Sequence, residues 1–145
     1  MTDWKTVTGD ATRHLRRNGL IGGAIALLIL VIAPPTAGAH GFTAPLGWWL
    51  LLTFTLLPLA FSVHLLFDAA LFRLAASHGA ENAGLSAIDD VLSRMGLRAG
   101  DATPRTLTER LSGCRRLVWF QRVTLAIGVG LYLVLLLDAA DGGGV

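Results

Sequence analysis

The sequence predicts an all-α integral membrane protein with three transmembrane helices and a small helical loop between the second and the third. Hydrophobic residues make up 53% of the 145 residues and charged residues only 15%, against about 25% in a typical soluble domain. No Asp, Glu, Lys or Arg occurs from Asn18 through Phe67. A water-soluble domain of this size cannot bury so long an uncharged stretch. The composition therefore excludes a soluble globular protein, a disordered chain and a nucleic-acid-binding protein.

The first apolar segment, residues 19–33, follows the tail 1–18 and predicts a short transmembrane helix. As a helix it is about 22 Å long, which is less than the roughly 30 Å of hydrocarbon in a bilayer. We expect Pro34 and Pro35 to end this helix, because proline lacks the backbone N–H that continues the helical hydrogen bonds.

The same segment is also typical of a secretory signal peptide covering residues 1–39. A basic stretch precedes the apolar core, and Ala37-Gly38-Ala39 matches an A-x-A cleavage motif. We favour retention as an anchor helix, but the pattern leaves both outcomes open. Removal would make His40 the first residue, where a terminal amine and an imidazole together chelate Cu(II). An exported copper-handling protein is therefore one functional hypothesis, although no second His on that side completes a site.

The second and third apolar segments, residues 46–74 and 117–137, are each long enough to cross the hydrocarbon. Trp48 and Trp49 lie at the start of one segment and Trp119 at the start of the other, and tryptophan prefers the headgroup level. A helix satisfies its own backbone hydrogen bonds in lipid, so we expect all three segments to be helical.

Small residues spaced four apart indicate faces where helices pack closely. Gly19 and Gly23 form such a pair in the first segment, and Ala126 and Gly130 form one in the third. Small side chains let two helix backbones approach each other within the membrane.

The basic residues indicate the orientation. All twelve Lys and Arg residues lie in the tail, at the end of the second segment, in the loop 75–116 or just inside the third segment. Residues 34–45 and the tail 138–145 contain none. Because basic residues mark the cytoplasmic side, we expect the N-terminus and the loop 75–116 inside and the C-terminus outside.

The bias toward Arg, Ala, Gly and Leu is typical of a GC-rich bacterial genome, so the predicted location is the bacterial inner membrane.

Two helices are predicted in the loop 75–116. Ser86 is placed to cap the first, which runs to Met95 and turns Asp89, Asp90 and Arg94 away from its apolar stripe. That stripe comprises Leu85, Ile88, Leu92 and Met95.

The second loop helix is predicted to continue directly into the third transmembrane segment. Thr103-Pro104 is one candidate for its start, and a capping box of Thr106 and Glu109 is the alternative. We expect the two loop helices to pack on each other, with partner binding as the second possibility.

Four polar side chains lie inside the apolar segments. His64 and Asp68 are four residues apart and share one helix face, while Gln121 and Arg122 lie near the same surface on the third segment. An unpaired charge in hydrocarbon is costly, so we expect an Asp68–Arg122 ion pair extended by His64 and Gln121. We favour a structural clamp over a proton relay, because the cluster lies near one surface.

No sequence motif indicates an enzyme. Cys114 is the only cysteine, so neither an internal disulfide nor a CxxC site is possible. No cofactor or metal is predicted, and a haem bound by His64 would need a second His from a partner chain.

The leading hypothesis is a non-enzymatic accessory or interaction subunit that binds the lipid bilayer and a protein partner or further copies of itself. The alternative is a membrane-anchor subunit of a redox or ion-coupled complex using His64, Asp68 and Arg122.

Overall fold

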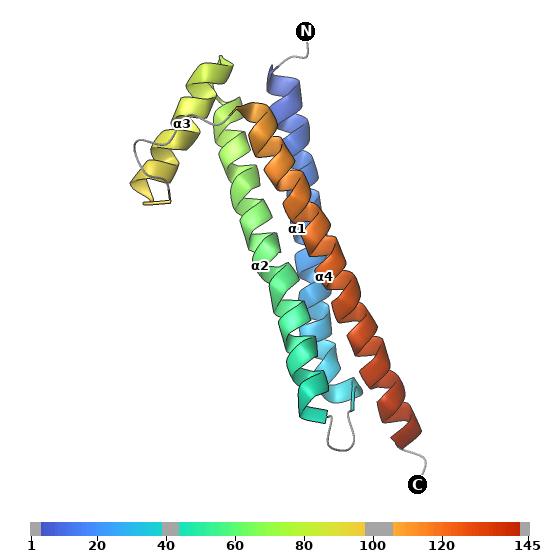
Figure 1. Cartoon of the computed structure of the whole chain (residues 1–145). Coiled ribbons are helices and arrows are strands. Elements are labelled where there is room, and N and C mark those ends of the chain that lie inside the picture. The colour runs from blue at the N-terminus through green and yellow to red at the C-terminus, as the bar shows by residue number, and fades with distance from the viewer. Residues whose placement is uncertain (1–3, 39–43, 98–105, 143–145) are drawn as a thin grey trace.

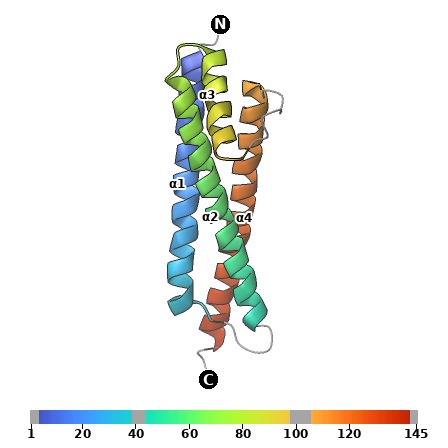
Figure 2. The same cartoon turned by 90° about the vertical axis from the view of Figure 1, so that its left-hand side faces the viewer.

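The structure, a computed structural model, describes residues 4–38, 44–97 and 106–142. Within these ranges it contains helices and no strand: α1 (Trp4–Thr36), α2 (Ala44–Ala76), α3 (Glu81–Arg94) and α4 (Leu107–Gly142). Figure 1 shows α1, α2 and α4 side by side in a long bundle, with α2 antiparallel to the other two. The short helix α3 lies beside the last turns of α2 (Figure 2). We call this the α3 end of the bundle. The end of α1, the start of α2 and the last turn of α4 lie at the opposite end.

Helices α1, α2 and α4 are each long and apolar enough to cross a membrane. The prediction of an all-helical chain with three such helices is therefore confirmed. A helix of 33 residues, such as α1 or α2, is about 50 Å long and exceeds the roughly 30 Å of hydrocarbon. The apolar part of α1 is therefore shorter than the helix, and the polar residues before Gly19 lie at the α3 end.

Helix α1 is longer at both ends than the apolar segment indicated. It begins at Trp4 and continues through Pro34 and Pro35 to Thr36, so the expectation that the prolines end it was wrong. The last turn is held by the Thr36 hydroxyl, which donates to the Ile32 carbonyl at 2.6 Å. The Ala37 N–H also donates to the Ala33 carbonyl at 2.8 Å. These bonds support the turn in which the prolines supply no N–H.

The buried apolar side chains form three clusters. The cluster at the α3 end joins α1, α2 and α4 and comprises Leu15, Leu65, Ala69, Phe72, Cys114 and Val118. The cluster at the opposite end joins the same helices and comprises Ile29, Ala33, Ala37, Leu51 and Leu135. The third cluster attaches α3 to α2 and comprises Leu71, Ala75 and Ile88.

Glycines allow close approach between the helices. An added Cβ at Gly19 or Gly23 would lie 3.2 Å from atoms of Ser62, so this small-residue face of α1 packs on α2. An added Cβ at Gly128 would lie 2.8 Å from the Phe54 carbonyl O, which makes Gly128 a close α4 contact to α2. The predicted pair Ala126 and Gly130 instead lies on the exposed face of α4.

Helix α3 begins earlier than expected. Its N-cap is Ala80, which makes no side-chain capping bond, and Ser86 lies inside the helix with its hydroxyl donating to the Ala83 carbonyl at 3.0 Å. The prediction of Ser86 as the cap was therefore wrong. Burial of Gly84 against the Ala75 carbonyl, where a Cβ would lie at 2.8 Å, favours the extra turn. Within the stripe, Ile88 is buried but Met95 is exposed.

Helix α4 is continuous from the loop into the apolar segment, as predicted. The Thr106–Glu109 capping box is confirmed: the Thr106 N–H donates to Glu109 Oε2 at 3.0 Å, and the Glu109 N–H donates to Thr106 Oγ1 at 3.4 Å. Thr103-Pro104, the other candidate start, lies outside the described residues.

Candidate functional site

Polar side chains gather in two places toward the α3 end of the apolar helices. The first, which we call the amide layer, comprises Asn18, Ser62, Gln121 and Arg122. The second, which we call the α2/α4 groove, is a cavity of about 380 Å³ bounded by α2, α3 and α4. Its polar lining residues are His64, Asp68, Glu109, Arg110 and Cys114.

The amide layer joins the three long helices through Gln121. This side chain is 2% exposed. Its Nε2 donates to Ser62 Oγ of α2 at 2.7 Å and to the Asn18 carbonyl of α1 at 3.5 Å. An added Cβ at Gly22 would overlap Gln121 Nε2, so glycine at this position lets the amide keep its present place. A satisfied buried amide of this kind holds membrane helices in one register.

Arg122 lies beside this layer but does not meet Asp68. Its Nη2 donates to Asn18 Oδ1 at 3.0 Å. Asp68 instead lies 4.0 Å from His64 Nε2 and accepts a hydrogen bond from Cys114 Sγ at 3.6 Å. The expected Asp68–Arg122 ion pair is therefore not formed.

The helix register explains why the ion pair fails. Gln121 of α4 lies opposite Ser62 of α2, and Cys114 lies opposite Asp68. Cys114 and Arg122 are two turns apart on α4, which is about 12 Å along the helix axis. The structure thus brings together His64 with Asp68, and Gln121 with Ser62, but leaves the two predicted halves of the cluster separate.

The α2/α4 groove combines apolar walls with two carboxylates, Asp68 and Glu109, and its lining arginine, Arg110, is already paired with Asp89 of α3. Phe67, Leu92, Leu97 and Leu117 are among its apolar lining residues. The Asp68 side chain is 20% exposed, so its carboxylate is reachable from the groove. This arrangement suits a ligand that carries both apolar groups and a positive charge.

Arg110 ties α3 to α4 through a pair that the sequence did not predict. Its side chain is 12% exposed, and its Nη2 donates to Asp89 Oδ1 of α3. Asp89 was expected to face away from the stripe, and the structure instead directs it at α4. The Arg110 Nε is buried and has no hydrogen-bond partner among the described residues. No local sequence pattern marks a pair that is brought together only once α3 packs on α2.

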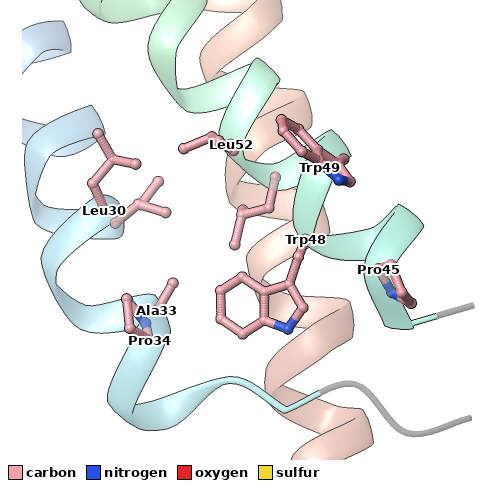
Figure 3. Close-up of a pocket in the computed structure, with 9 residues that line it drawn as sticks. Leu30, Ala33, Pro34, Pro45, Trp48, Trp49 and Leu52 are labelled. Carbon is pink, nitrogen blue, oxygen red and sulfur yellow. The ribbon is translucent and has the colours of Figure 1, made fainter.

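A separate crevice between α1 and α2 lies at the opposite end of the bundle. Figure 3 shows Trp48 pointing toward Ala33 and Pro34 of α1, with Leu52 and Trp49 farther along α2. This cavity of about 320 Å³ is lined by apolar and tryptophan side chains and by no charged residue. It suits a lipid chain and offers no catalytic group.

The described residues contain no group of three His, Cys, Asp or Glu side chains that could hold a metal ion. His40, the residue of the copper hypothesis, lies outside them. That hypothesis therefore stays a prediction from the sequence.

No family model, curated protein or solved structure matches this chain. The amide layer and the α2/α4 groove are accordingly interpreted from their own geometry and chemistry.

Proposed function

We propose that the chain is a multi-pass protein of the bacterial inner membrane with its N-terminus and α3 in the cytoplasm. The support is the distribution of basic residues, because the segments that carry them meet at the α3 end (Figure 1). Positive charge favours the cytoplasmic side. An alkaline phosphatase fused to the C-terminus is then active in the periplasm. An inactive phosphatase fusion, together with an active fusion of a cytoplasmic reporter at the same C-terminus, would overturn this orientation.

Retention of residues 1–39 is part of this proposal. Gly19, Gly22 and Gly23 of α1 are buried against Ser62 and Gln121, so removal of α1 would expose two polar side chains to lipid. Intact mass spectrometry of protein from native membranes should give about 15.4 kDa. A mass lacking residues 1–39 would instead favour the two-helix form with a terminal His40.

We propose that the protein is a non-enzymatic interaction subunit and that the α2/α4 groove is its binding surface for a protein partner. The observation that carries the proposal is that one groove joins the partly exposed Asp68 carboxylate to apolar side chains, of which Leu97 is 66% exposed. Exposed apolar area beside a reachable carboxylate is typical of an interface rather than of a solvated helix surface.

The partner that fits is the cytoplasmic end of a transmembrane helix carrying Lys or Arg. Such a segment presents apolar residues toward the membrane and a positive charge at the headgroup level, matching the leucines and Asp68 of the groove. Electrostatic complementarity of this kind sets orientation and register between two chains.

Site-specific photo-crosslinking in cells tests the proposal. A photoreactive residue at Leu92 or Leu97, in the groove, should crosslink to one and the same membrane protein. The same group at Arg73, exposed on α2 and outside the groove lining, is the matched control. Asp68→Asn should reduce the adduct about tenfold, which corresponds to a lost charged contact. Equal adducts at Leu97 and Arg73, or an adduct unaffected by Asp68→Asn, would refute the groove as the interface.

A redox or ion-coupled anchor is the second candidate, and the His64–Asp68 couple favours it. The two side chains lie 4.0 Å apart in the groove, and an imidazole held beside a carboxylate can exchange protons near neutral pH. Gentle purification followed by an absorption spectrum tests this role. A Soret band that disappears in His64→Ala, together with a co-purifying His donor, would support the anchor over the interaction subunit.

A further inference from the structure

Two arginines at the α3 end of the bundle carry positive charge and have no acidic partner among the described residues. Arg122 donates to the neutral Asn18 amide, and Arg17 makes no ion pair within that part of the chain. Over the described part of the chain, no Asp or Glu lies within ion-pair distance of either guanidinium. Asn18 is itself oriented by its Nδ2, which donates to the His14 carbonyl at 2.8 Å and so directs Oδ1 at Arg122.

These side chains line a groove between α1 and α4, which we call the α1/α4 groove. It has a volume of about 380 Å³, and Arg17, Asn18, Gln121 and Arg122 are among its lining residues. It adjoins a second cavity of about 460 Å³, which shares His14 and Arg122 and adds Arg115 and Trp119. Among the residues that the structure describes, the combined surface therefore holds three arginines and no carboxylate.

The α1/α4 groove lies where the helices change from polar to apolar. On α1, Arg17 is followed by Leu20 and Ile21, which are large, exposed apolar side chains. On α4, Trp119 is 60% exposed, and exposed tryptophan prefers the headgroup level. The groove continues on its apolar side to Ile21 and Leu125. This change of polarity is the pattern expected where helices pass from the lipid phosphates to the first methylenes of the acyl chains.

We propose that the α1/α4 groove binds the headgroup of an anionic phospholipid, with the lipid phosphate held by Arg17 and Arg122. A planar guanidinium donates two parallel hydrogen bonds to phosphate oxygens. Basic pockets between transmembrane helices are suited to anionic headgroups. An anionic lipid fits better than a zwitterionic one, since no carboxylate in the groove balances the arginines. The inference requires only that the helices cross a membrane, and it does not depend on the partner proposed for the α2/α4 groove.

Native mass spectrometry of the protein released from nanodiscs tests the proposal. The nanodiscs contain equal amounts of phosphatidylglycerol and phosphatidylcholine, and the measured quantity is the ratio of the two lipids retained per chain. Wild type should retain phosphatidylglycerol preferentially. Because each arginine near anionic lipid strengthens binding about fivefold, Arg17→Gln/Arg122→Gln should lower that preference about thirtyfold.

The matched control is Arg13→Gln/Arg16→Gln. These two arginines are exposed on α1 close to Arg17 but do not line the α1/α4 groove. This control removes the same charge and should leave the lipid preference nearly unchanged. If both double variants lose it equally, the lipid is attracted by a diffuse basic belt and the groove is not a site. A wild type with no preference for phosphatidylglycerol would equally overturn the proposal.

A variant that keeps both arginines separates loss of lipid binding from loss of folding. Asn18→Asp places a carboxylate beside Arg122 without removing either arginine, and it should lower the preference about fivefold by neutralising one charge. Asn82→Asp adds the same charge on the exposed start of α3 and should have no effect on the lipid preference.

Addition of millimolar inorganic phosphate separates the two sources of the anion, which are a lipid headgroup and free phosphate. Displacement of the lipid by free phosphate would show a phosphate site and refute the lipid assignment.

Discussion

Replacing Gly128 with Ala tests a close backbone approach between α2 and α4. A Cβ at Gly128 would lie 2.8 Å from the Phe54 carbonyl O and 3.3 Å from its carbonyl C, whereas ordinary contacts begin at 3.4 Å. The shortfall is about 0.6 Å, in the range where packing responds steeply. Because the obstacle is backbone, no side-chain rotation relieves it, and the two helices must separate.

The expected effect is a destabilisation of about 1–3 kcal/mol from overpacking. A gap of roughly 0.5–1 Å forfeits a quarter to a half of the dispersion energy of the atom pairs across it. Helix propensity opposes the loss, since Ala is favoured over Gly in a helix by up to about 1 kcal/mol. Gly130→Ala isolates that opposing effect, because Gly130 is on the same helix and has nothing within 4 Å of its added Cβ.

The assay is reversible unfolding by SDS in mixed micelles, followed by far-ultraviolet circular dichroism. Gly130→Ala should be neutral or slightly stabilising. Gly128→Ala should then be less stable than Gly130→Ala by about 1–3 kcal/mol, a difference in which propensity and unfolded-state effects largely cancel. Equal stability of the two variants would show that α2 and α4 do not meet at Gly128, and the bundle geometry would be refuted.

Three further predictions concern the polar contacts. Ser62→Ala removes the nearer of the two acceptors of the buried Gln121 amide. It should lower stability in the same SDS titration by about 0.6–1.7 kcal/mol. Unchanged stability would contradict the hydrogen bond between Gln121 and Ser62. Arg110→Gln weakens the link to Asp89, so hydrogen exchange should become faster in α3 but not in the apolar part of α1; equal protection in α3 would show that the link does not hold this helix. Cys114 is buried and should react with a maleimide about tenfold or more slowly in the folded protein than in SDS; rapid labelling of the folded protein would contradict its burial.

The three long helices were predictable because a long apolar run has few ways to satisfy its backbone in lipid. The extension of α1 back to Trp4 was not, because residues 4–18 are polar and carry no apolar run. Their contacts are tertiary: Thr8 and Leu15 are buried, and Trp4 lies against Gly84 of α3. Ser86 was likewise a plausible cap by residue type, but a cap preference of about 1 kcal/mol was outweighed by the packing of Gly84.

The candidate site was predictable only within one helix. His64 and Asp68 were expected to share a face because they are four residues apart, and the structure places them in contact. Their partner across the interface depends on the register between α2 and α4, which hydropathy defines no better than to a turn or two. The actual register pairs Asp68 with Cys114 and Gln121 with Ser62. The Arg110–Asp89 link had no local signal at all, since the packing of α3 creates it.

The two proposed binding surfaces share Cys114 as a lining residue, but Asp68 and Arg122 have different partners and should act independently of each other. Groups more than about 7–10 Å apart with no shared partner contribute additively to within about 0.3–0.5 kcal/mol, and two turns of α4 separate Cys114, beside Asp68, from Arg122. Asp68→Asn should therefore reduce the partner crosslink about tenfold and leave the lipid preference intact, while Arg17→Gln/Arg122→Gln should lower the lipid preference and leave the crosslink intact. The change in unfolding free energy of the triple variant should equal the sum of the changes in Asp68→Asn and in Arg17→Gln/Arg122→Gln. A coupling clearly above that margin would mean that Asp68 and Arg122 interact after all, and the ion pair expected from their depth alone would have to be restored.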